Sequence, residues 1–520
     1  MLNRMEFRRF RLREAVAAIL LPLAFLLAVR IYSVCCGGES DRDSFYHAIM
    51  AESGPEVFAA KQFPSTTMSV WQENFSDKEL GFHLLLWSVF RCGGLLGMDN
   101  VPPFHLQSAF LMLLLLVAVA VLLLRLGVRG VWRWTMLFAV LSPPLTERLM
   151  AIRPHVLAIA LFALTTAALC TPALMRGWRK WLTFFLAGLA FGYCYSNPHF
   201  VLMPAGAFAL AAVIADREWR ALLLPVVSLV GVAVALTLHP QFPNSFLIWK
   251  IQGLEVVWGM LSPGSGPIGG SELTSGGWDT LKCAPFLLAL PLLAAWIVAM
   301  RLKSCRRIGR ELLFLSILGI GTGIGLCLYF RMAEYGVLAL TVALAAWERP
   351  LDRRTVVRRV CTAYVVAAVL WSAGYFRQAA KEVWNPYRDL AEWVHARGIP
   401  PGSVIGHLSW GDFPQLIYTL PEYRFLCGLD PMFAAGRYRE PMLVLEDLRR
   451  GVKFTSPDKL QRLIGSRWLW ISREGEIAAQ RLYLYGYVPV FECPDGWMFK
   501  LDEPLHAGKP ADVPRLTAPE

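Results

Sequence analysis

Long apolar runs fill most of the first 376 residues of the chain. Residues 104–124 and 221–238, for example, contain no Lys, Arg, Asp or Glu. A bilayer span needs about 20 mostly apolar residues, and a helix in a soluble core rarely reaches that length without a charge. The hydropathy pattern therefore predicts a polytopic α-helical membrane protein.

The pattern changes after residue 376, where apolar runs become short and charged residues recur regularly. Such short runs, punctuated by Gly and Pro, are typical of a small α/β domain. The expected elements are helices at 389–397 and 458–464, strands at 404–405 and 467–472, and a hairpin formed by 487–492 and 497–501.

These two patterns divide the chain into three parts. We expect a transmembrane module at 1–376 with a long outer loop at 35–103, an extracytoplasmic α/β domain at 377–506, and a disordered tail at 507–520.

Basic residues set the expected orientation. The net charge is +12, but most Lys and Arg residues lie in short segments between apolar runs. Loops of this kind are retained in the cytoplasm, so the charge indicates membrane topology and argues against nucleic-acid binding. If residues 81–96 form an interfacial helix on the outer leaflet, every basic cluster lies inside. The chain then has about eleven spans, with the N-terminus inside and the C-terminus outside the inner membrane.

The cysteines give no metal or redox motif. Eleven cysteines are scattered along the chain, and no Cys-x-x-Cys occurs. Cys427 and Cys493 both lie in the C-terminal domain, where a disulfide and two buried free thiols are equally compatible with the sequence.

Ionisable side chains are distributed unevenly between the two predicted faces. The candidate residues gather in outer loops or at outer span ends, where ionisable groups at membrane depth suggest a functional site. They are Asp41, Asp43, His47, Asp77, His83, Arg153, His155, His199, His239, Arg331 and Glu334.

The segment Ser40–His47 places two carboxylates and an imidazole just after the first span. A carboxylate there can accept a proton from an attacking hydroxyl, and Asp41 and Asp43 are the candidate ligands if a divalent metal is needed. A solvated acidic loop is the alternative interpretation. Arg153 and Arg331 are candidates for gripping a phosphate, while contact with membrane lipid headgroups is the alternative for each arginine.

The order of these features resembles the GT-C superfamily of membrane glycosyltransferases, which includes protein O-mannosyltransferases, aminoarabinose transferases and oligosaccharyltransferases. The stretch from Asp77 to His83, Asp-Lys-Glu-Leu-Gly-Phe-His, resembles the Asp-Lys-Pro-Pro-Leu stretch and following interfacial helix of the aminoarabinose-transferase branch, although Glu79 and Gly81 depart from it. Arg331-Met-Ala-Glu-Tyr335 resembles the late outer-loop arginine that some members use on the lipid phosphate.

The resemblance implies transfer of a sugar from a polyprenyl-phosphate donor to a glycan, lipid or protein acceptor at the outer face. Asp43 falls where such enzymes carry the first-loop catalytic aspartate, with Asp41 as the other candidate and Asp77 as a further carboxylate. Arg331, Arg153, His155 and His239 are the expected groups on the departing lipid phosphate.

Two further classes remain open. A transporter or lipid flippase would use the outer polar residues as one end of a substrate path, but such proteins usually carry midplane charges or broken helices. A non-catalytic scaffold would present the C-terminal domain to a partner and would leave the uneven distribution of polar residues unexplained.

Overall fold

The computed structural model describes residues 4–34, 39, 41–98, 103–255, 283–304, 308–328, 332–351, 355–378, 385–434, 436–453 and 455–502. The chain forms two compact units. The first, which we call the membrane unit, comprises Met1–Ala59 and Asp77–Trp384. The second, the C-terminal unit, comprises Ala60–Ser76 and Asn385–Glu520.

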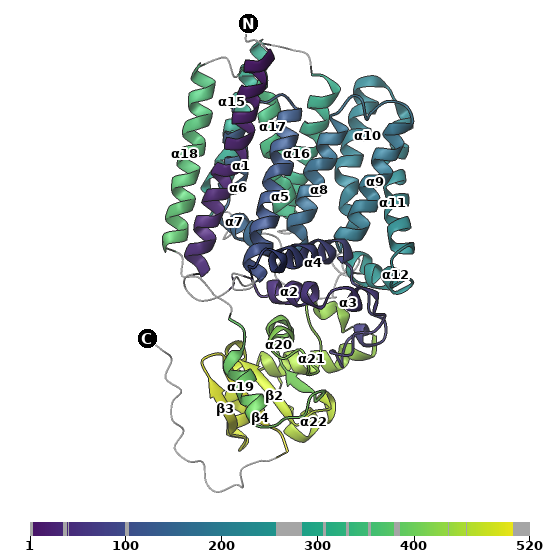
Figure 1. The fold of residues 1–520 in the computed structure, drawn as a ribbon, viewed down its shortest axis with the longest axis vertical. Coiled ribbons are helices and arrows are strands. Elements are labelled where there is room, and N and C mark those ends of the chain that lie inside the picture. Colours follow the sequence, from purple (N-terminus) through teal and green to yellow (C-terminus); the bar gives the residue numbers. More distant parts are fainter. Residues whose placement is uncertain are drawn as a thin grey trace. The chain divides into compact units, whose positions relative to one another are not determined.

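Long helices that run side by side make up most of the membrane unit (Figure 1). They are α1 (Arg4–Val34), α5 (Pro103–Arg125), α6 (Val131–Val140), α8 (Pro154–Leu169), α9 (Trp178–Cys194), α10 (Leu202–Asp216), α11 (Leu224–Thr237), α15 (Pro285–Ser304), α16 (Arg310–Leu328), α17 (Ala333–Glu348) and α18 (Thr355–Gln378).

Shorter helices complete this unit, and two of them, α2 and α4, lie across the end of the bundle that is far from the N-terminus (Figure 1). The short helices are α2 (Asp43–Ser53), α3 (Pro55–Ala59), α4 (Leu80–Leu95), α7 (Pro143–Met150), α12 (Asn244–Trp249), η2 (Pro198–Val201), η3 (Trp219–Leu223), η4 (Lys250–Glu255) and η7 (Arg349–Leu351). Helix α4 matches the helix expected at 81–96 and is apolar, but it is shorter than a span.

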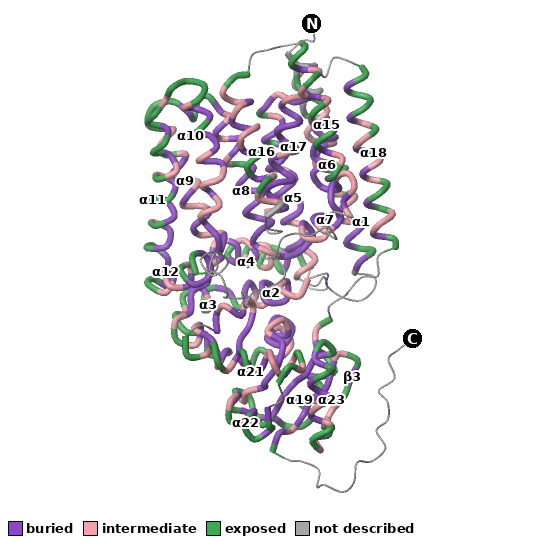
Figure 2. Tube along the Cα trace, turned by 180° about the vertical axis from the view of Figure 1, so that it is seen from behind, coloured by how far each residue is buried: buried purple, intermediate pink, exposed green. Residues whose placement is uncertain are grey.

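Within the described residues, six helices are long and apolar enough to cross a membrane, or seven if α7 and α8 form one broken span. Their outward faces carry exposed apolar side chains, among them Leu20, Val226, Leu292 and Leu370. Figure 2 shows exposed positions along the outer helices α11 and α18. Lipid solvates such surfaces, which water does not, so the chain is a multi-pass membrane protein. The expected total of about eleven spans stays a prediction.

The basic segments meet at one end of the bundle. Glu14 of α1 accepts a hydrogen bond from the Gly130 amide, and Arg133, at the start of α6, forms a buried ion pair with Glu348 of α17. Further contacts at this end join Arg349 to Glu311, Arg310 to Asp216, and Lys180 to Glu218. The sequence predicted that these segments share one side of the membrane. That this end of the bundle lies on the cytoplasmic side of the membrane stays a prediction.

Glycines allow α9 and α11 to pack backbone to backbone. A Cβ atom at Gly188 would lie 1.9 Å from the carbonyl oxygen of Ser228, and one at Gly231 would lie 2.2 Å from that of Phe185. Small residues at such crossings are typical of membrane helix pairs, where packing rather than hydrophobic burial drives association.

The C-terminal unit is built on a four-stranded sheet with the order β1-β2-β4-β3. Its strands are β1 (Ile405–His407), β2 (Trp468–Ser472), β3 (Pro489–Cys493) and β4 (Gly496–Lys500). β1 and β2 are parallel, whereas β4 is antiparallel to both β2 and β3. β2 is buried along its whole length, and the predicted strands and hairpin are confirmed.

Helices accompany this sheet in the C-terminal unit, and α19 (Arg388–Ala396) contacts β3 while α23 (Glu476–Leu484) contacts β2. The helices are α19, α20 (Phe413–Thr419), α21 (Arg439–Arg449), α22 (Pro457–Ile464) and α23, with short turns η1 (Val70–Gln72), η8 (Trp410–Asp412), η9 (Pro431–Phe433), η10 (Gly436–Tyr438) and η11 (Arg473–Gly475). Helices α19 and α22 confirm the two expected helices. Cys427 and Cys493 are both buried free thiols. The tail expected to be disordered, 507–520, lies outside the described residues.

Part of the predicted outer loop belongs to the C-terminal unit. Thr66 forms a β-bridge with Phe425, and the Met68 amide donates to the Leu426 carbonyl over 2.8 Å. The ring of Trp71 packs against Phe433 with 4.5 Å between centroids. The hydropathy pattern did not predict this pairing, because backbone bridges between distant segments leave no periodic signal in either one.

Candidate functional site

A sharp break between α7 and α8 places Arg153 at the end of the bundle. The two helices are bent by 102°, and Arg153 occupies the position before α8 in an extended conformation, with φ −134° and ψ 146°. Pro154 follows it, and a residue before proline is biased away from the helical region. The local sequence Ile-Arg-Pro-His therefore ends one helix and starts the next at Arg153.

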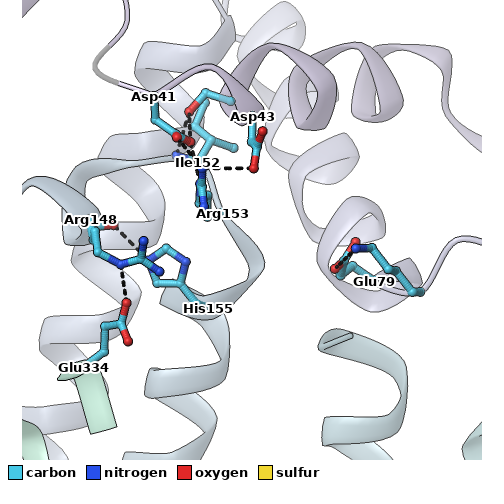
Figure 3. Close-up of polar contacts among 10 residues, drawn as sticks. Asp41, Asp43, Glu79, Arg148, Ile152, Arg153, His155 and Glu334 are labelled. Atoms are coloured by element: carbon cyan, nitrogen blue, oxygen red, sulfur yellow. Dashed lines mark hydrogen bonds and ion pairs between the residues drawn. The ribbon is translucent and has the colours of Figure 1, made fainter. Parts of the chain in front are cut away.

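Arg153 joins the two first-loop aspartates. Its Nε and one Nη donate to the two carboxylate oxygens of Asp41 over 2.8 and 2.6 Å, and the same Nη lies 2.9 Å from a carboxylate oxygen of Asp43. Figure 3 shows the guanidinium between the two carboxylates. We call these three residues the Arg153 cluster. Its side chains are 16 to 23% exposed, so they lie at an accessible edge and are not deeply buried.

Two residues that sequence reasoning did not select hold this cluster in place. The Ser44 hydroxyl donates to Asp41 over 3.3 Å and accepts a hydrogen bond of 3.1 Å from the Ile152 amide. The first bond lies within the first loop, and the second links that loop to the break between α7 and α8.

Arg30 makes a second link of the same kind. Its two Nη atoms donate to the carboxylate of Glu39 over 3.1 and 2.7 Å, and one of them also donates to the Met150 carbonyl over 2.9 Å. Glu39 comes two residues before Asp41, and Met150 comes three before Arg153. One buried guanidinium thus fixes both segments of the cluster. The signal in the sequence was a single arginine directly after an apolar run.

Glu334, a candidate for binding substrate, pairs with another residue that the sequence analysis missed. It is buried at the start of α17 and forms an ion pair with Arg148 of α7. His155 Nε2 donates to the Arg148 carbonyl over 3.1 Å, as Figure 3 shows. These contacts brace α7, α8 and α17 against one another beside the Arg153 cluster.

A second group of polar side chains lies between α2 and α4. His83 Nδ1 is 2.8 Å from both carboxylate oxygens of Asp77, and His83 Nε2 is 2.9 Å from His47 Nδ1. All three residues are nearly fully buried, as is Glu79. We call Asp77, His83, His47 and Glu79 the histidine cluster. Its members lie on the first loop, α2 and α4.

The segment after α11 fixes the backbone of Asp77. His239 Nε2 donates to the Asp77 carbonyl over 3.0 Å, and Gln241 accepts from the Asp77 amide. The Gln241 amide in turn donates to His239 Nδ1 over 3.2 Å. Gln241 was not predicted, because a lone Gln in a loop carries no pattern. His239 therefore positions Asp77 through the main chain.

The hydrogen bonds define how the protons lie in the histidine cluster. A carboxylate accepts, so His83 Nδ1 carries a proton, and in its neutral form His83 Nε2 then accepts from His47 Nδ1–H. Burial lowers the pKa of His47 well below its usual value, and the positive charge of Arg153 acts in the same direction. Burial also raises the pKa of Tyr46, with Asp77 and Glu79 adding to the effect.

The two clusters adjoin each other through α2. Asp43 and His47 lie one helical turn apart on that helix, and side chains at this spacing lie on the same face. Gly81 lets α4 approach α9 closely, because a Cβ there would lie 2.7 Å from Cys194 Sγ. This close approach accounts for the glycine at that position of the Asp-Lys-Glu-Leu-Gly stretch.

His199 takes no part in the contacts described above. His199 lies in the turn η2, where its ring contacts Phe200 and its buried Nδ1 has no hydrogen-bond partner among the described residues. Arg331, the candidate for the lipid phosphate, lies outside the described residues.

Solved structures share this architecture at low sequence identity. The Archaeoglobus fulgidus oligosaccharyltransferase, in complex with Zn and sulfate, matches with a TM-score of 0.59 and 13% identity over 90% of this chain and 69% of its own. ArnT from Cupriavidus metallidurans, bound to undecaprenyl phosphate, matches with a TM-score of 0.54 and 14% identity over 97% of this chain and 100% of its own.

The mycobacterial arabinofuranosyltransferase AftD matches with a TM-score of 0.51 and 14% identity over 94% of this chain and 41% of its own. The chain has the GT-C glycosyltransferase fold. At these identities the likeness concerns the fold alone. No protein-family model matches the sequence, and no curated protein does.

The zinc in the archaeal structure raises the question of which residues here suit a metal. Asp41 and Asp43, the expected ligands, already have the positive guanidinium of Arg153 between them, so their present arrangement does not suit a cation. His47, Glu79 and His83 offer two imidazoles and a carboxylate close together, which are the ligand types that zinc prefers. A metal, if one is bound, fits the histidine cluster better.

Proposed function

We propose that the protein transfers a sugar from a polyprenyl-phosphate donor to an acceptor at the outer face of the inner membrane. The observation that carries this proposal is the Arg153 cluster, in which two first-loop carboxylates meet an arginine at a broken membrane helix. Support also comes from the fold, since the similar ArnT structure contains undecaprenyl phosphate. The acceptor is a glycan, a lipid or a protein.

In the proposed reaction, Asp43 is the general base. It takes the proton from an acceptor hydroxyl or amide, whose oxygen or nitrogen attacks the anomeric carbon of the sugar. The bond between that carbon and the phosphate oxygen breaks, and the polyprenyl phosphate leaves with the electron pair, so the anomeric configuration inverts. A positioned base of this kind contributes about 10²–10⁴-fold to rate.

Asp41 and Arg153 have a positioning role in this scheme. Asp41 engages Arg153 with both oxygens, whereas the ion pair of Asp43 uses one of its oxygens. The arginine thus holds the start of α2, where Asp43 lies, against the break between α7 and α8. Because Arg153 is engaged by carboxylates, we assign the lipid phosphate chiefly to Arg331.

A lipid flippase is the second candidate, and the 102° break between α7 and α8 favours it. Broken helices with polar groups at their ends are typical of transporters. The two functions differ in chemistry, since a flippase moves its lipid substrate intact while a transferase releases polyprenyl phosphate.

A lipid assay separates the two. The full-length protein in lipid nanodiscs is incubated with a panel of undecaprenyl-phosphate sugars and a membrane extract as the source of acceptor, and undecaprenyl phosphate is quantified by mass spectrometry. The proposal predicts release of the free lipid phosphate with one donor of the panel. Transbilayer movement of intact donor in liposomes, with no release by the same preparation, would establish the flippase instead.

A further inference from the structure

Three buried side chains of the histidine cluster have the composition of a metal site. One ligand atom from each of His47, Glu79 and His83 lies within 4.8 Å of the other two. Zinc binds such atoms at about 2.0–2.2 Å, so ligands of one ion lie about 3 to 4.4 Å apart. We propose that these three residues bind one divalent transition-metal ion of the zinc type.

The two imidazole nitrogens lie close to the spacing of ligands on one ion. His47 Nδ1 and His83 Nε2 are 2.9 Å apart, with one proton between them when both rings are neutral. A cation that replaces this proton would be bound by both nitrogens once small rotations of the rings bring them to the ligand spacing of about 3 to 4.4 Å. Both rings are held by burial, with His83 0% and His47 3% exposed.

Glu79 supplies the strongest reason to place a cation here. Its side chain is 2% exposed, and Lys78 Nζ lies 3.5 Å from Oε1. The other oxygen, Oε2, is buried and has no hydrogen-bond partner among the described residues. Leaving a carboxylate oxygen buried and unpaired costs free energy. A metal ion between Glu79 and the two imidazoles would remove that cost.

Asp77 supports the proposed metal ligand His83 through a hydrogen bond. It accepts from His83 Nδ1, which leaves His83 Nε2 to face His47 and the ion. Histidine ligands in proteins almost always donate their second ring nitrogen to a carboxylate or carbonyl in this way, which fixes the ring and raises its basicity. Gln241 and His239 hold the main chain of Asp77, so the support is itself fixed.

The ligand set selects the class of ion. Two imidazole nitrogens and one carboxylate suit Zn²⁺, Co²⁺ or Ni²⁺ and not the hard ions Mg²⁺ and Ca²⁺, which prefer oxygen alone. Three protein ligands also leave a position for water or another oxygen ligand. The site differs from the Asp41–Asp43 pair, where a guanidinium provides the positive charge.

Metal content tests this proposal without reference to sugar transfer, so its failure and that of the proposed function are distinguishable. The full-length protein in detergent is stripped with a chelator, exposed to Zn²⁺, desalted and analysed by inductively coupled plasma mass spectrometry. We expect one equivalent of zinc per chain and a higher unfolding temperature with zinc than without. When Co²⁺ replaces zinc, we expect a visible absorption spectrum typical of Co²⁺ bound by nitrogen ligands.

Variants locate the ion. Glu79→Gln keeps the side-chain size and is expected to lose the equivalent of zinc, and Asp77→Asn is expected to weaken binding by about 10–100-fold. Asp43→Asn retains zinc, as does His395→Gln, which alters an exposed His–Glu pair in the C-terminal unit. If Glu79→Gln does not fold, the Asp77→Asn affinity and the wild-type cobalt spectrum decide the question.

Three results would overturn the proposal. They are a wild-type protein without bound zinc or thermal response, a Glu79→Gln variant that binds as tightly as the wild type, and a loss of zinc in Asp43→Asn.

Discussion

The guanidinium of Arg153 contacts both carboxylate oxygens of Asp41, a residue 112 positions earlier in the chain. This contact brings the start of the first loop to the break between two helices, and Asp43 shares the same nitrogen. A planar fork with several donors is needed to serve both carboxylates at once, and arginine alone among the side chains provides one.

Arg153→Lys tests the importance of that fork. Lysine keeps the positive charge but is a point charge on a flexible stem, so it cannot hold Asp41 through two nitrogens and also reach Asp43. We expect at least a tenfold lower rate of polyprenyl-phosphate release, in a protein that remains monodisperse in detergent. Arg437→Lys is the matched control, because it alters an exposed Arg–Glu pair in the C-terminal unit. Equal rates in both variants would show that the fork is dispensable.

Arg30 and Glu39 are expected to act as one positioning unit for the cluster. Arg30→Gln and Glu39→Gln should each lower kcat more than they raise KM, because the two residues position the Arg153 cluster without belonging to it. In a double-mutant cycle on kcat, we expect the double variant to be about as slow as the slower single variant, because residues in one ion pair are not additive. Additive effects would contradict a shared role, and Arg30→Lys should recover part of kcat.

Helix packing can be tested by adding single carbon atoms. Gly188→Ala places a Cβ against the Ser228 carbonyl, so α9 and α11 must separate, whereas Gly206→Ala in α10 meets nothing within 4 Å. We expect the first variant to lower the unfolding temperature in detergent by at least about 5 °C. The second should leave it unchanged or slightly higher, because alanine favours a helix over glycine. Similar temperatures for both variants would contradict the described packing.

His407 makes the stability of the C-terminal unit depend on pH. Burial lowers the pKa of His407 to about 4, and its ring bonds the Ser409 carbonyl through Nδ1 and the Leu426 amide through Nε2. The neutral ring satisfies both bonds. The full stability is therefore present above the ordinary pKa of about 6.5 and is lost as the pH falls toward 4, by up to about 1.4 kcal/mol per pH unit.

Hydrogen exchange of peptides covering residues 404–426 in the full-length protein measures this loss, after correction for the intrinsic exchange rate at each pH. His407→Asn can keep the bond to Ser409 but does not titrate, so it should reduce the dependence between pH 6.5 and 4. The exposed residue His395, changed to Gln, serves as the control. An unchanged slope in His407→Asn would assign the effect to other groups.

Much of the fold and part of the candidate site followed from sequence patterns. Hydropathy predicted the helices and the strand β2, because span length and continuous apolar character are local properties. The uneven distribution of histidines pointed to one end of the bundle, where His47, His83 and His239 do lie near Asp77. The bracing of Asp41 and Arg153 by Ser44 was not predictable, because it depends on how separate segments meet.

The missed residues share one property. Arg30, Arg148 and Gln241 each act through a partner far away in the sequence, and a single arginine or glutamine near a span end is also typical of contact with headgroups. Pairing of Ala60–Ser76 with the rest of the C-terminal unit depends on main-chain hydrogen bonds that any sequence can make and on a ring contact between residues far apart in the sequence. Neither kind of contact leaves a periodic signal.

The most direct test of the central claim compares donor binding with donor turnover in Asp43→Asn. Asparagine has the size of aspartate but cannot act as a base that takes the proton from the acceptor substrate. We predict that this variant binds the undecaprenyl-phosphate sugar used by the wild type with similar affinity, while releasing undecaprenyl phosphate about 10²–10⁴-fold more slowly. Asp389→Asn, which alters an exposed aspartate of the C-terminal unit, should behave as the wild type. Wild-type release by a folded Asp43→Asn protein would contradict the account.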